Sequence, residues 1–427
     1  MQPGIPQTNK KRIVIVGGGF GGLKLVRKLS KLDVQVVLID KNNYHQFQPL
    51  FYQVATSGLE PSSISFPFRK IFQKNHSVVF RVANVTSVEP AKNILITDIG
   101  EITYDYLVIA TGANTNFFGN ENFRKYGLPM KNVSEALKIR NMVLQHYEDA
   151  LTADNETARQ ALMNIVIVGG GPTGVEIAGT LADMRRFILP KDYPELDFSM
   201  MKIHLLEASP RLLNGMADIS GIKASEYLQR LGVSVKVNTR VKDYDGNTVQ
   251  LGDGQNIESR TLIWAAGVAG NIVKGISEDL IIKNNRIKVD RNNKVEGTAN
   301  IYAIGDIAYM TEEKYPNGHP QVAQVAIQQA ECLAKNFENV FNNKALTPFH
   351  YKDLGSMATV GRNLAVVDLP AVKFNGFLAW LIWMFVHLMS IVGTKNRLFI
   401  FINWMWNYIT YDQSLRLIIK PPDNKQV

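Results

Sequence analysis

The sequence predicts an α/β protein that is built from two copies of one strand–turn–helix module and ends in a helical region. The heptapeptide IVIVGGG occurs twice, at residues 13–19 and 165–171. Four of the five tryptophans lie in the last fifth of the chain, within residues 380–406. With 427 residues, of which 46% are hydrophobic, the chain is long enough to form two or three globular domains.

The first copy of the module lies at residues 12–22, RIVIVGGGFGG, where an apolar strand enters the pattern Gly17-x-Gly19-x-x-Gly22. A helical stretch, LKLVRKLSKL, follows, and the next strand ends on Asp40, 18 residues after Gly22. Such glycines permit a tight turn and close approach of a pyrophosphate, and the acid accepts hydrogen bonds from a ribose diol. The pattern therefore predicts a dinucleotide site; the alternative is that the glycines only relieve crowding between helix and strand.

The second copy has the same glycine spacing, Gly169-x-Gly171-x-x-Gly174, after the strand NIVIV. Its next strand ends on Glu207, 33 residues after Gly174, because the stretch LPKDYPELDFSM is inserted before it. An acid at this place accepts from a ribose 2′-hydroxyl and repels a 2′-phosphate, which favours NADH over NADPH. Arg211 lies close enough in sequence to leave that preference open.

Both copies continue in the same way after their glycine turns. Each has a run of alternating, turn-rich strands and then a buried strand that ends in small residues, YLVIATG at Gly112 and TLIWAAG at Gly267. The distance from first glycine to closing glycine is 95 residues in one copy and 98 in the other. The near-equal spacing indicates two whole modules, one for each dinucleotide.

A further short strand, IYAIGDI at residues 301–307, ends on a Gly-Asp pair. Two dinucleotide turns, an ATG-type turn and a late Gly-Asp pair together resemble the two-dinucleotide-binding-domain flavoproteins. The resemblance implies that the first module and the late segment hold FAD non-covalently, and that the second module, inserted between them, holds NADH. The residues implied for FAD are Gly17, Gly19, Gly22, Asp40, Val85, Thr111, Gly112 and Asp306. Those implied for NADH are Gly169, Gly171, Gly174 and Glu207.

The chain has a single cysteine, Cys332, so it holds no cysteine pair for disulfide or metal chemistry, and we expect no metal site. The electron acceptor must therefore meet the flavin directly. Three stretches, at residues 45–59, 319–330 and 395–418, together with GPTGVEIAG, resemble the type II NADH dehydrogenases. These are single-subunit, non-proton-pumping NADH:quinone oxidoreductases, and the resemblance covers nearly the whole chain.

Three polar residues are candidates for the chemistry. Gln324 and Gln328 are four residues apart and share one helix face, where their amides can donate to a quinone carbonyl or form a solvated face. The resemblance favours the quinone site. Glu176 is expected in the first turn of its helix, where the dipole favours a structural carboxylate; the resemblance implies that it orients the nicotinamide or relays protons. His45 and His387 are expected to be packing residues.

The C-terminal region predicts two apolar, aromatic helices separated by the basic pair Lys395 and Arg397. Tryptophan and flanking cations favour a membrane interface, so we expect a monotopic anchor. Residues 374–394 carry no charge and approach the length of a membrane-spanning helix, which is one alternative. A buried dimerisation surface is another, and the resemblance implies a homodimer that docks through this region.

The expected fold is thus α/β, with two Rossmann-like dinucleotide-binding domains, the second inserted in the first, and a C-terminal amphipathic helical region that anchors to a membrane. The expected domains are residues 11–118 and 271–350 for FAD, 119–270 for NADH, and 351–427 for anchoring and dimerisation. The formal charge of +9 fits an anionic membrane surface better than nucleic acid, because the cations are spread along the chain. No targeting signal is seen, which favours the cytoplasmic face of a cell membrane.

The expected reaction is hydride transfer from NADH to FAD and two-electron reduction of a membrane quinone to quinol, without ion pumping. One alternative is an NADH-dependent reductase of a soluble electron carrier. Another is a membrane-attached NADH sensor, which would show no rapid turnover with a quinone.

Overall fold

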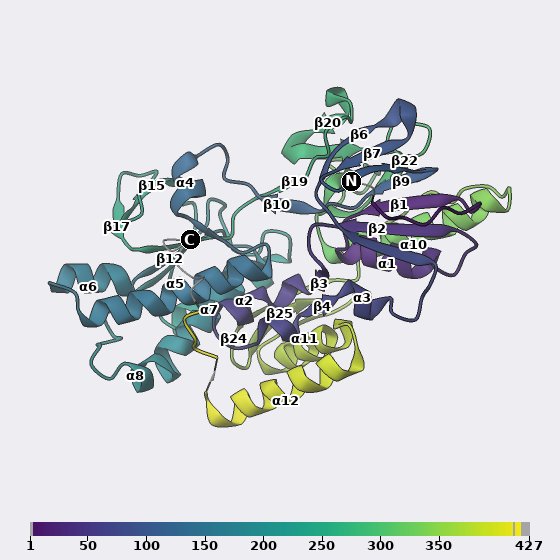
Figure 1. Ribbon diagram of the computed structural model, residues 1–427. Coiled ribbons are helices and arrows are strands. Elements are labelled where there is room, and N and C mark those ends of the chain that lie inside the picture. The colour runs from purple at the N-terminus through teal and green to yellow at the C-terminus, as the bar shows by residue number, and fades with distance from the viewer. Residues whose placement is uncertain (1–2, 413–414, 420–427) are drawn as a thin grey trace, which may run out of the picture. The chain divides into compact units, whose positions relative to one another are not determined.

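The computed structural model describes residues 3–412 and 415–419 (Figure 1). The chain divides into two compact units. Unit 1 comprises Met1–Gln46, Phe66–Asn114 and Val268–Asp353, and unit 2 comprises Phe47–Ser65, Thr115–Gly267 and Leu354–Val427. The end of the expected C-terminal region, residues 420–427, lies outside the described residues, as do residues 413–414.

Unit 1 is centred on a five-stranded parallel sheet in the order β22–β9–β1–β2–β5. Its central strand is made of isoleucine and valine and is almost fully buried, as expected where a parallel sheet is covered on both faces. In the register of this sheet, Val14 lies opposite Val37 on one side and Leu107 on the other. The strands are β1 Arg12–Val16, β2 Gln35–Asp40, β5 Val78–Val82, β9 Tyr106–Ile109 and β22 Ile301–Ala303.

Helices α1 (Phe20–Leu29) and α10 (Ala323–Phe341) lie side by side next to this sheet (Figure 1). Val14 and Val16 of β1 instead form a core with residues of a small antiparallel sheet, β6–β7–β8. The other elements of unit 1 are β3 Tyr44–Gln46, α3 Phe68–Ile71, β6 Val85–Glu89, β7 Ile94–Thr97, β8 Gly100–Thr103, β19 Val268–Gly270, β20 Ile281–Ile282, β21 Arg286–Lys288 and β23 Ala308–Tyr309. Strands β4 Ser65–Pro67 and β10 Ala113–Thr115 lie at the unit boundaries.

Unit 2 repeats this plan. Its parallel sheet has the order β11–β18–β12–β13–β14, and a three-stranded antiparallel sheet, β15–β16–β17, packs against Val166 and Val168 of β12. The strands are β11 Leu128–Pro129, β12 Ile165–Val168, β13 Ile203–Leu206, β14 Val233–Lys236, β15 Val241–Tyr244, β16 Thr248–Leu251, β17 Asn256–Glu258 and β18 Thr261–Trp264. The prediction of two copies of one α/β module is confirmed.

Unit 2 also carries the long helices and the C-terminal region. Its helices are α2 Phe51–Ala55, α4 Glu121–Tyr126, α5 Val133–Leu151, α6 Glu156–Met163, α7 Pro172–Phe187, α8 Leu189–Asp192, α9 Asp218–Arg230, α11 Phe377–Ser390 and α12 Thr394–Thr410. An antiparallel sheet of β24 Ser356–Gly361, β25 Leu364–Asp368 and β26 Lys373–Asn375 precedes α11.

The break between α11 and α12 differs from the sequence expectation. Residues 391–393 separate the two helices, with Gly393 at a φ of +86°. Lys395 and Arg397 therefore lie inside the first turn of α12, not between the helices. A glycine adopts this backbone angle without strain, which is why the break falls at Gly393 and not at the charged pair.

Candidate functional site

The two glycine turns have nearly the same geometry. Gly17 and Gly169 follow β1 and β12 at φ angles of +101° and +112°, which side chains rarely adopt. A Cβ on Gly22 would lie 1.8 Å from the carbonyl oxygen of Gly17, and one on Gly174 would lie 1.8 Å from that of Gly169. These glycines therefore let each helix begin directly against its own strand.

The second glycine of each Gly-x-Gly-x-x-Gly pattern, Gly19 or Gly171, has open space beside it. A Cβ on Gly19 or on Gly171 would meet nothing within 4 Å, and both residues are helix N-caps that have no side-chain cap. The N-termini of α1 and α7 thus begin beside open space, where the helix dipole favours the negative charge of an anion. A pyrophosphate fits both turns.

Each module has an acidic residue at the end of its second strand. Its carboxylate accepts a hydrogen bond from the middle residue of the Gly-Gly-Gly triplet, Gly18 or Gly170. Asp40 Oδ2 accepts from the Gly18 backbone N–H at 2.6 Å, and Glu207 Oε2 accepts from the Gly170 N–H at 2.6 Å. Burial raises the pKa of Asp40, and its bonds from Asn42 and Gly18 oppose this rise. Both carboxylates are therefore fixed beside the turns, and each oxygen has capacity for another donor such as a ribose hydroxyl.

The other residues predicted for FAD also lie in unit 1. Thr111 and Gly112 follow β9, and a Cβ on Gly112 would meet nothing within 4 Å. Asn271, which the sequence reasoning missed, holds this turn: its side-chain amide donates to the Thr111 carbonyl at 2.9 Å, and its backbone carbonyl accepts from the Thr111 hydroxyl at 2.7 Å. Val85 begins β6, and Asp306 lies three residues after the end of β22, in a short 3-10 turn. These open backbone positions and the Asp40 carboxylate fit FAD.

Three of the four residues predicted for NADH, all except Gly174, line a cleft in unit 2 of about 690 Å³. Glu207, Gly169 and Gly171 contribute to it, together with the aromatic rings of Phe118 and Trp264. The complete lining is Phe118, Val168, Gly169, Gly171, Leu206, Glu207, Ala208, Thr239, Arg240, Val241, Trp264, Ala265, Ala266 and Gly267.

The arginine that lines this cleft is not Arg211, which the sequence places close to Glu207. The side chain of Arg211 bonds to the carbonyls of Met216 and Asn214 and pairs with Asp218, so it is turned away from the cleft lining. Arg240 lines the cleft instead. It lies in the loop before β15, and no motif in the sequence connects that loop with Glu207.

Glu176 is not in the first turn of its helix, as expected from the sequence. Because α7 begins at Pro172, directly after the Gly171 cap, Glu176 is the fifth helical residue and lies one turn further in. Its side chain is 7% exposed, and burial raises its pKa from 4.5 to about 8, against the opposing effects of the Thr359 backbone N–H and the nearby Trp383 indole. Desolvation, and not the helix dipole, therefore controls this carboxyl.

Gln324 and Gln328 lie on α10 in unit 1, half-buried on the side that faces residues 351–352. The Tyr351 hydroxyl donates to Gln324 Oε1 at 3.4 Å. The Gln328 amide donates to the Lys352 carbonyl at 2.8 Å and accepts from the Lys352 N–H at 3.0 Å. The neighbouring Gln329 is buried, and its Oε1 accepts from the Gly305 N–H at 2.7 Å, beside Asp306.

His45 is buried and His387 is half-buried, and both rings pack against other side chains, as expected. His45 Nδ1 lies 2.9 Å from the Gly18 carbonyl, and burial lowers the pKa of His45 to about 4. His387 stacks on Trp383 with ring centroids 4.0 Å apart, and burial lowers its pKa to about 4 as well. Among the described residues, no group of three metal-ligating side chains is close enough to hold an ion.

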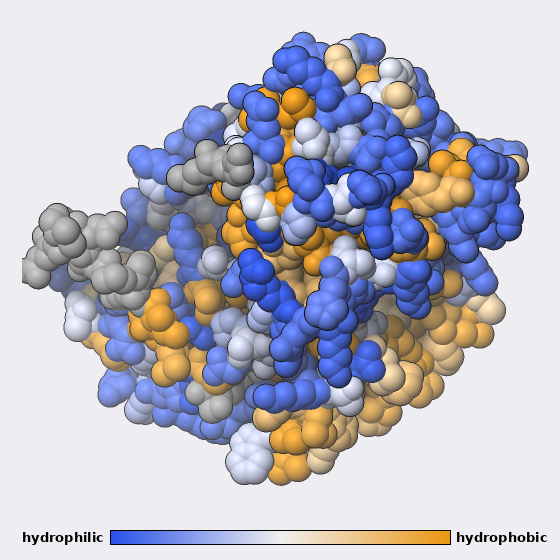
Figure 2. Space-filling view, turned by 45° about the vertical axis from the view of Figure 1, so that its right-hand side comes forward, coloured by the Kyte–Doolittle hydropathy of each residue, from blue (hydrophilic) through white to orange (hydrophobic). Residues whose placement is uncertain are grey.

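Helices α11 and α12 present many apolar side chains to solvent. Figure 2 shows hydrophobic side chains gathered at the lower edge of the face in view. The exposed apolar residues of the two helices are Phe377, Leu378, Leu381, Phe385, Val386, Met389, Leu398, Phe399, Phe401, Ile402, Met405, Trp406, Tyr408 and Ile409. In the part of the chain that the structure describes, none of the helices is both long enough and apolar enough to span a bilayer.

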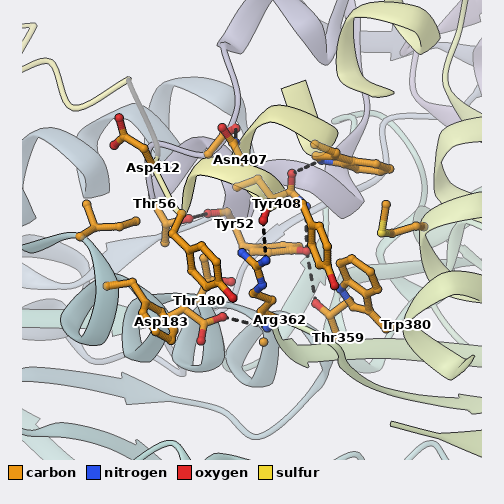
Figure 3. Close-up of a pocket in the computed structure, with 18 of the residues that line it drawn as sticks. Tyr52, Thr56, Thr180, Asp183, Thr359, Arg362, Trp380, Asn407, Tyr408 and Asp412 are labelled. Atoms are coloured by element: carbon orange, nitrogen blue, oxygen red, sulfur yellow. Dashed lines mark hydrogen bonds between the residues drawn. The ribbon is translucent and has the colours of Figure 1, made fainter. Parts of the chain in front are cut away.

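Behind these helices, unit 2 holds a pocket of about 160 Å³ with aromatic walls (Figure 3). Trp380, Trp383 and Trp404 line it from α11 and α12, and Tyr52 lines it from α2. Arg362 lies over the rings of Tyr408 and Tyr411, with its guanidinium carbon 4.0 and 3.6 Å from their centroids. The pocket was not predicted, because its walls come from segments more than 300 residues apart.

The fold and its two glycine turns define a class of proteins. Residues 11–330 match the family model of the pyridine nucleotide-disulphide oxidoreductases, and residues 354–410 match that of the NDH2 C-terminal domain. The chain thus has the two-dinucleotide-binding flavoprotein fold, although a single cysteine leaves it no disulphide.

Comparison with individual proteins gives the narrower family. The chain is 34% identical to the type II NADH:quinone oxidoreductase Ndh of Mycobacterium tuberculosis, over 96% of this chain and 90% of that protein. It is 30% identical to the type II NADH:quinone oxidoreductase of Haemophilus influenzae, over 84% of this chain and 87% of that protein. The chain therefore belongs to the type II NADH:quinone oxidoreductase family.

Solved structures show the same fold. The structure of NDH2 from Plasmodium falciparum in complex with NADH matches with a TM-score of 0.87 at 24% identity, over 96% of this chain and all of that chain. The sulfide:quinone oxidoreductase of Aquifex aeolicus matches with a TM-score of 0.72 at 21% identity, over 91% of this chain and 92% of that chain.

Proposed function

We propose that this chain transfers two electrons from NADH to a membrane quinone through bound FAD, without pumping ions. The observation that carries the proposal is the duplicated glycine turn. Each unit has one such turn, with open space at a helix N-terminus and a carboxylate bonded to the middle N–H group. One chain thus offers two separate dinucleotide sites, in line with its membership of the type II NADH:quinone oxidoreductase family.

FAD belongs to unit 1 in this proposal. The α1 N-terminus at Gly19 holds its pyrophosphate, Asp40 accepts from the ribose, and Thr111, Gly112 and Asp306 lie along the rest of the cofactor, with the Val85 backbone near the adenine. Asn271 keeps the Thr111 turn in place through its two hydrogen bonds. When bound, FAD supplies the redox chemistry: it accepts a hydride from NADH and gives two electrons to the quinone.

NADH belongs to unit 2. Gly169 and Gly174 shape the turn, the α7 N-terminus at Gly171 faces the pyrophosphate, and Glu207 accepts from the 2′-hydroxyl of the adenosine ribose. Because a 2′-phosphate would meet the Glu207 carboxylate, NADPH is disfavoured. Arg240 in the same cleft is the counter-charge that keeps this discrimination from being absolute.

Glu176 orients the nicotinamide or relays protons. The overall reaction converts NADH, quinone and one proton into NAD⁺ and quinol, so one proton must be taken up. With a pKa raised to about 8, the Glu176 carboxyl is mostly protonated at neutral pH and can donate either a hydrogen bond or that proton.

Gln324 and Gln328 are proposed to contact the quinone. Of the two, Gln328 already uses both ends of its amide on Lys352, so it must give up its 2.8 Å bond to the Lys352 carbonyl before it donates to a quinone carbonyl.

The exposed apolar side chains of α11 and α12, with Lys395 and Arg397 beside them, support docking to an anionic membrane surface. The proposal places the protein as a monotopic homodimer on the cytoplasmic face of the membrane. It also keeps the expected domains: residues 11–118 and 271–350 for FAD, 119–270 for NADH, and 351–427 for anchoring and dimerisation.

The test is steady-state NADH oxidation by the purified holoenzyme in liposomes, with a short-chain quinone as acceptor and a pH indicator inside the vesicles. The proposal predicts rapid quinone-dependent turnover with no change of internal pH. Turnover only with a soluble electron carrier would instead support a carrier reductase. Absence of turnover with either acceptor would leave an NADH sensor.

A further inference from the structure

A continuous chain of hydrogen bonds in unit 2 joins helix α12 to β24. The Trp404 indole N–H donates to Gln53 Oε1 at 2.8 Å, and the Gln53 Nε2 donates to the Tyr52 hydroxyl at 3.0 Å. The Tyr52 hydroxyl in turn lies 3.2 Å from Thr359 Oγ1. Thr359 belongs to β24, which packs directly on α7: a Cβ on Gly179 of α7 would lie 1.9 Å from the carbonyl oxygen of Val360. Glu176 lies one helical turn before Gly179, and the Thr359 backbone N–H acts to lower the pKa of its carboxyl.

The chemistry of these groups fixes the direction of the first two hydrogen bonds of the chain. An indole N–H can only donate, so Trp404 determines which end of the Gln53 amide faces α12. The other end is an NH₂ group that can only donate, and it does so to the Tyr52 oxygen. Between Tyr52 and Thr359, either hydroxyl can be the donor.

The chain is shielded from water for most of its length. Tyr52 and Thr359 are buried, and Trp404 is 9% exposed. The Trp383 ring packs near both Tyr52 and Trp404, with its centroid 6.4 Å from that of Tyr52 and 5.9 Å from that of Trp404. Tyr52, Thr359 and Trp404 also line the aromatic pocket (Figure 3). Because all three side chains have low exposure, bulk water offers few substitutes for a bond that is lost.

Trp404 lies on the inner side of a helix whose outer side is apolar and exposed. Trp406, two residues further along the same helix, is 63% exposed and is not part of the hydrogen-bond chain. The helix that presents this apolar surface therefore also supplies the first donor of a chain that ends beside Glu176.

We propose that Tyr52, Gln53 and Trp404 are positioning residues for Glu176, and that they tie its carboxyl to helix α12 through Thr359. The inference rests on the proposed function, in which Glu176 acts at the nicotinamide or as a proton relay. Tyr52 and Gln53 act by holding β24 in register with α7, so that the Thr359 N–H stays directed at the carboxyl. Trp404 acts by fixing the orientation of the Gln53 amide.

The experiment titrates Glu176 directly in the full-length holoenzyme. The infrared band of its protonated carboxyl is identified by its loss in Glu176→Gln, and its midpoint is followed between pH 5 and 10. Tyr52→Phe keeps the aromatic ring and removes the bonds to Gln53 and Thr359, and Trp404→Phe keeps an aromatic side chain and removes the bond to Gln53. Trp406→Phe makes the same exchange on the outer side of α12 and is the matched control.

We expect Tyr52→Phe and Trp404→Phe each to raise the midpoint by about half a pH unit or more, because a loosened Thr359 N–H stabilises the carboxylate less. The control leaves the midpoint unchanged. Near-ultraviolet circular dichroism verifies that each variant is folded. If only one of the two variants folds, its midpoint alone tests the proposal. If both fold and titrate like the unmodified enzyme, the proposal is wrong.

Measurements of turnover distinguish a failure of the positioning role from a failure of the proposed function on which it rests. We expect Tyr52→Phe to lower kcat about fivefold or more with little change in KM for NADH, and to have no further effect when combined with Glu176→Gln. An unchanged midpoint together with a slow Glu176→Gln enzyme overturns the positioning role and leaves the proposed function intact. A shifted midpoint in an enzyme that gives no turnover with any quinone supports the positioning role and rejects the proposed function.

Discussion

Replacing Glu176 by glutamine should stabilise the protein at alkaline pH. The difference between the ordinary carboxyl pKa of 4.5 and the raised pKa of about 8 corresponds to about 5 kcal/mol, at about 1.4 kcal/mol per pH unit. This is the cost of holding the charged carboxylate in its buried site, and it is an upper value because the surroundings can relax. Glutamine has the same shape and no charge, so the variant avoids this cost.

The sign follows from proton binding. The folded protein keeps the Glu176 proton up to about pH 8, whereas the unfolded chain releases it near 4.5. The contribution of this group to stability is therefore highest below about pH 4.5, falls as the pH rises, and becomes constant above about pH 8. Unmodified protein should lose stability over this window relative to Glu176→Gln.

The assay is thermal unfolding of both holoenzymes at several values from pH 5 to pH 9. We expect nearly equal Tm values at pH 5 and a Tm for Glu176→Gln that is about 10 °C higher at pH 9, since about 1 kcal/mol shifts Tm by about 2–4 °C in domains of this size. The control is Glu121→Gln, because Glu121 is exposed on α4. A Tm difference for Glu176→Gln that does not change with pH would refute the reasoning.

Four other substitutions test the remaining parts of the account. Gly22→Ala places a Cβ 1.8 Å from the Gly17 carbonyl oxygen and should abolish FAD retention, measured as the flavin-to-protein ratio after purification. Asn271→Ala should lower that ratio without changing the far-ultraviolet circular dichroism, because it removes the side-chain bond from Asn271 to the Thr111 carbonyl and leaves only the bond from the Thr111 hydroxyl to the backbone carbonyl of residue 271. Glu207→Gln should raise kcat/KM for NADPH at least about tenfold, since like charges about 4 Å apart repel by about 1–4 kcal/mol; an unchanged NADPH preference would contradict the role of Glu207. Phe385→Ser on α11, where Phe385 is 67% exposed, should weaken binding to anionic liposomes about tenfold or more, whereas Ile222→Ser on α9 should not.

The parts of the fold that the sequence predicts are those set by local patterns. The glycine turns, their strands and the two acids were predictable because each lies within one strand–turn–helix unit, where φ angles and spacing determine the geometry. The bonds from Asp40 to Gly18 and from Glu207 to Gly170 follow directly from that geometry.

The parts that the sequence did not predict depend on long-range packing. The environment of Glu176 is set by β24 and α11, which no local motif of α7 encodes, so its raised pKa was not foreseen. Gln53 and Trp404 are 351 positions apart, and neither residue belongs to a motif that indicates a partner. Arg240 replaces Arg211 in the NADH cleft for the same reason.

The central claim is that one chain moves electrons from NADH through its flavin to a quinone. Stopped-flow absorbance of the anaerobic holoenzyme tests it most directly, with NADH mixed first and a short-chain quinone second. The account predicts rapid flavin bleaching with NADH and rapid recovery with the quinone. Flavin that stays oxidised with NADH, or that stays reduced when the quinone is added, would contradict it.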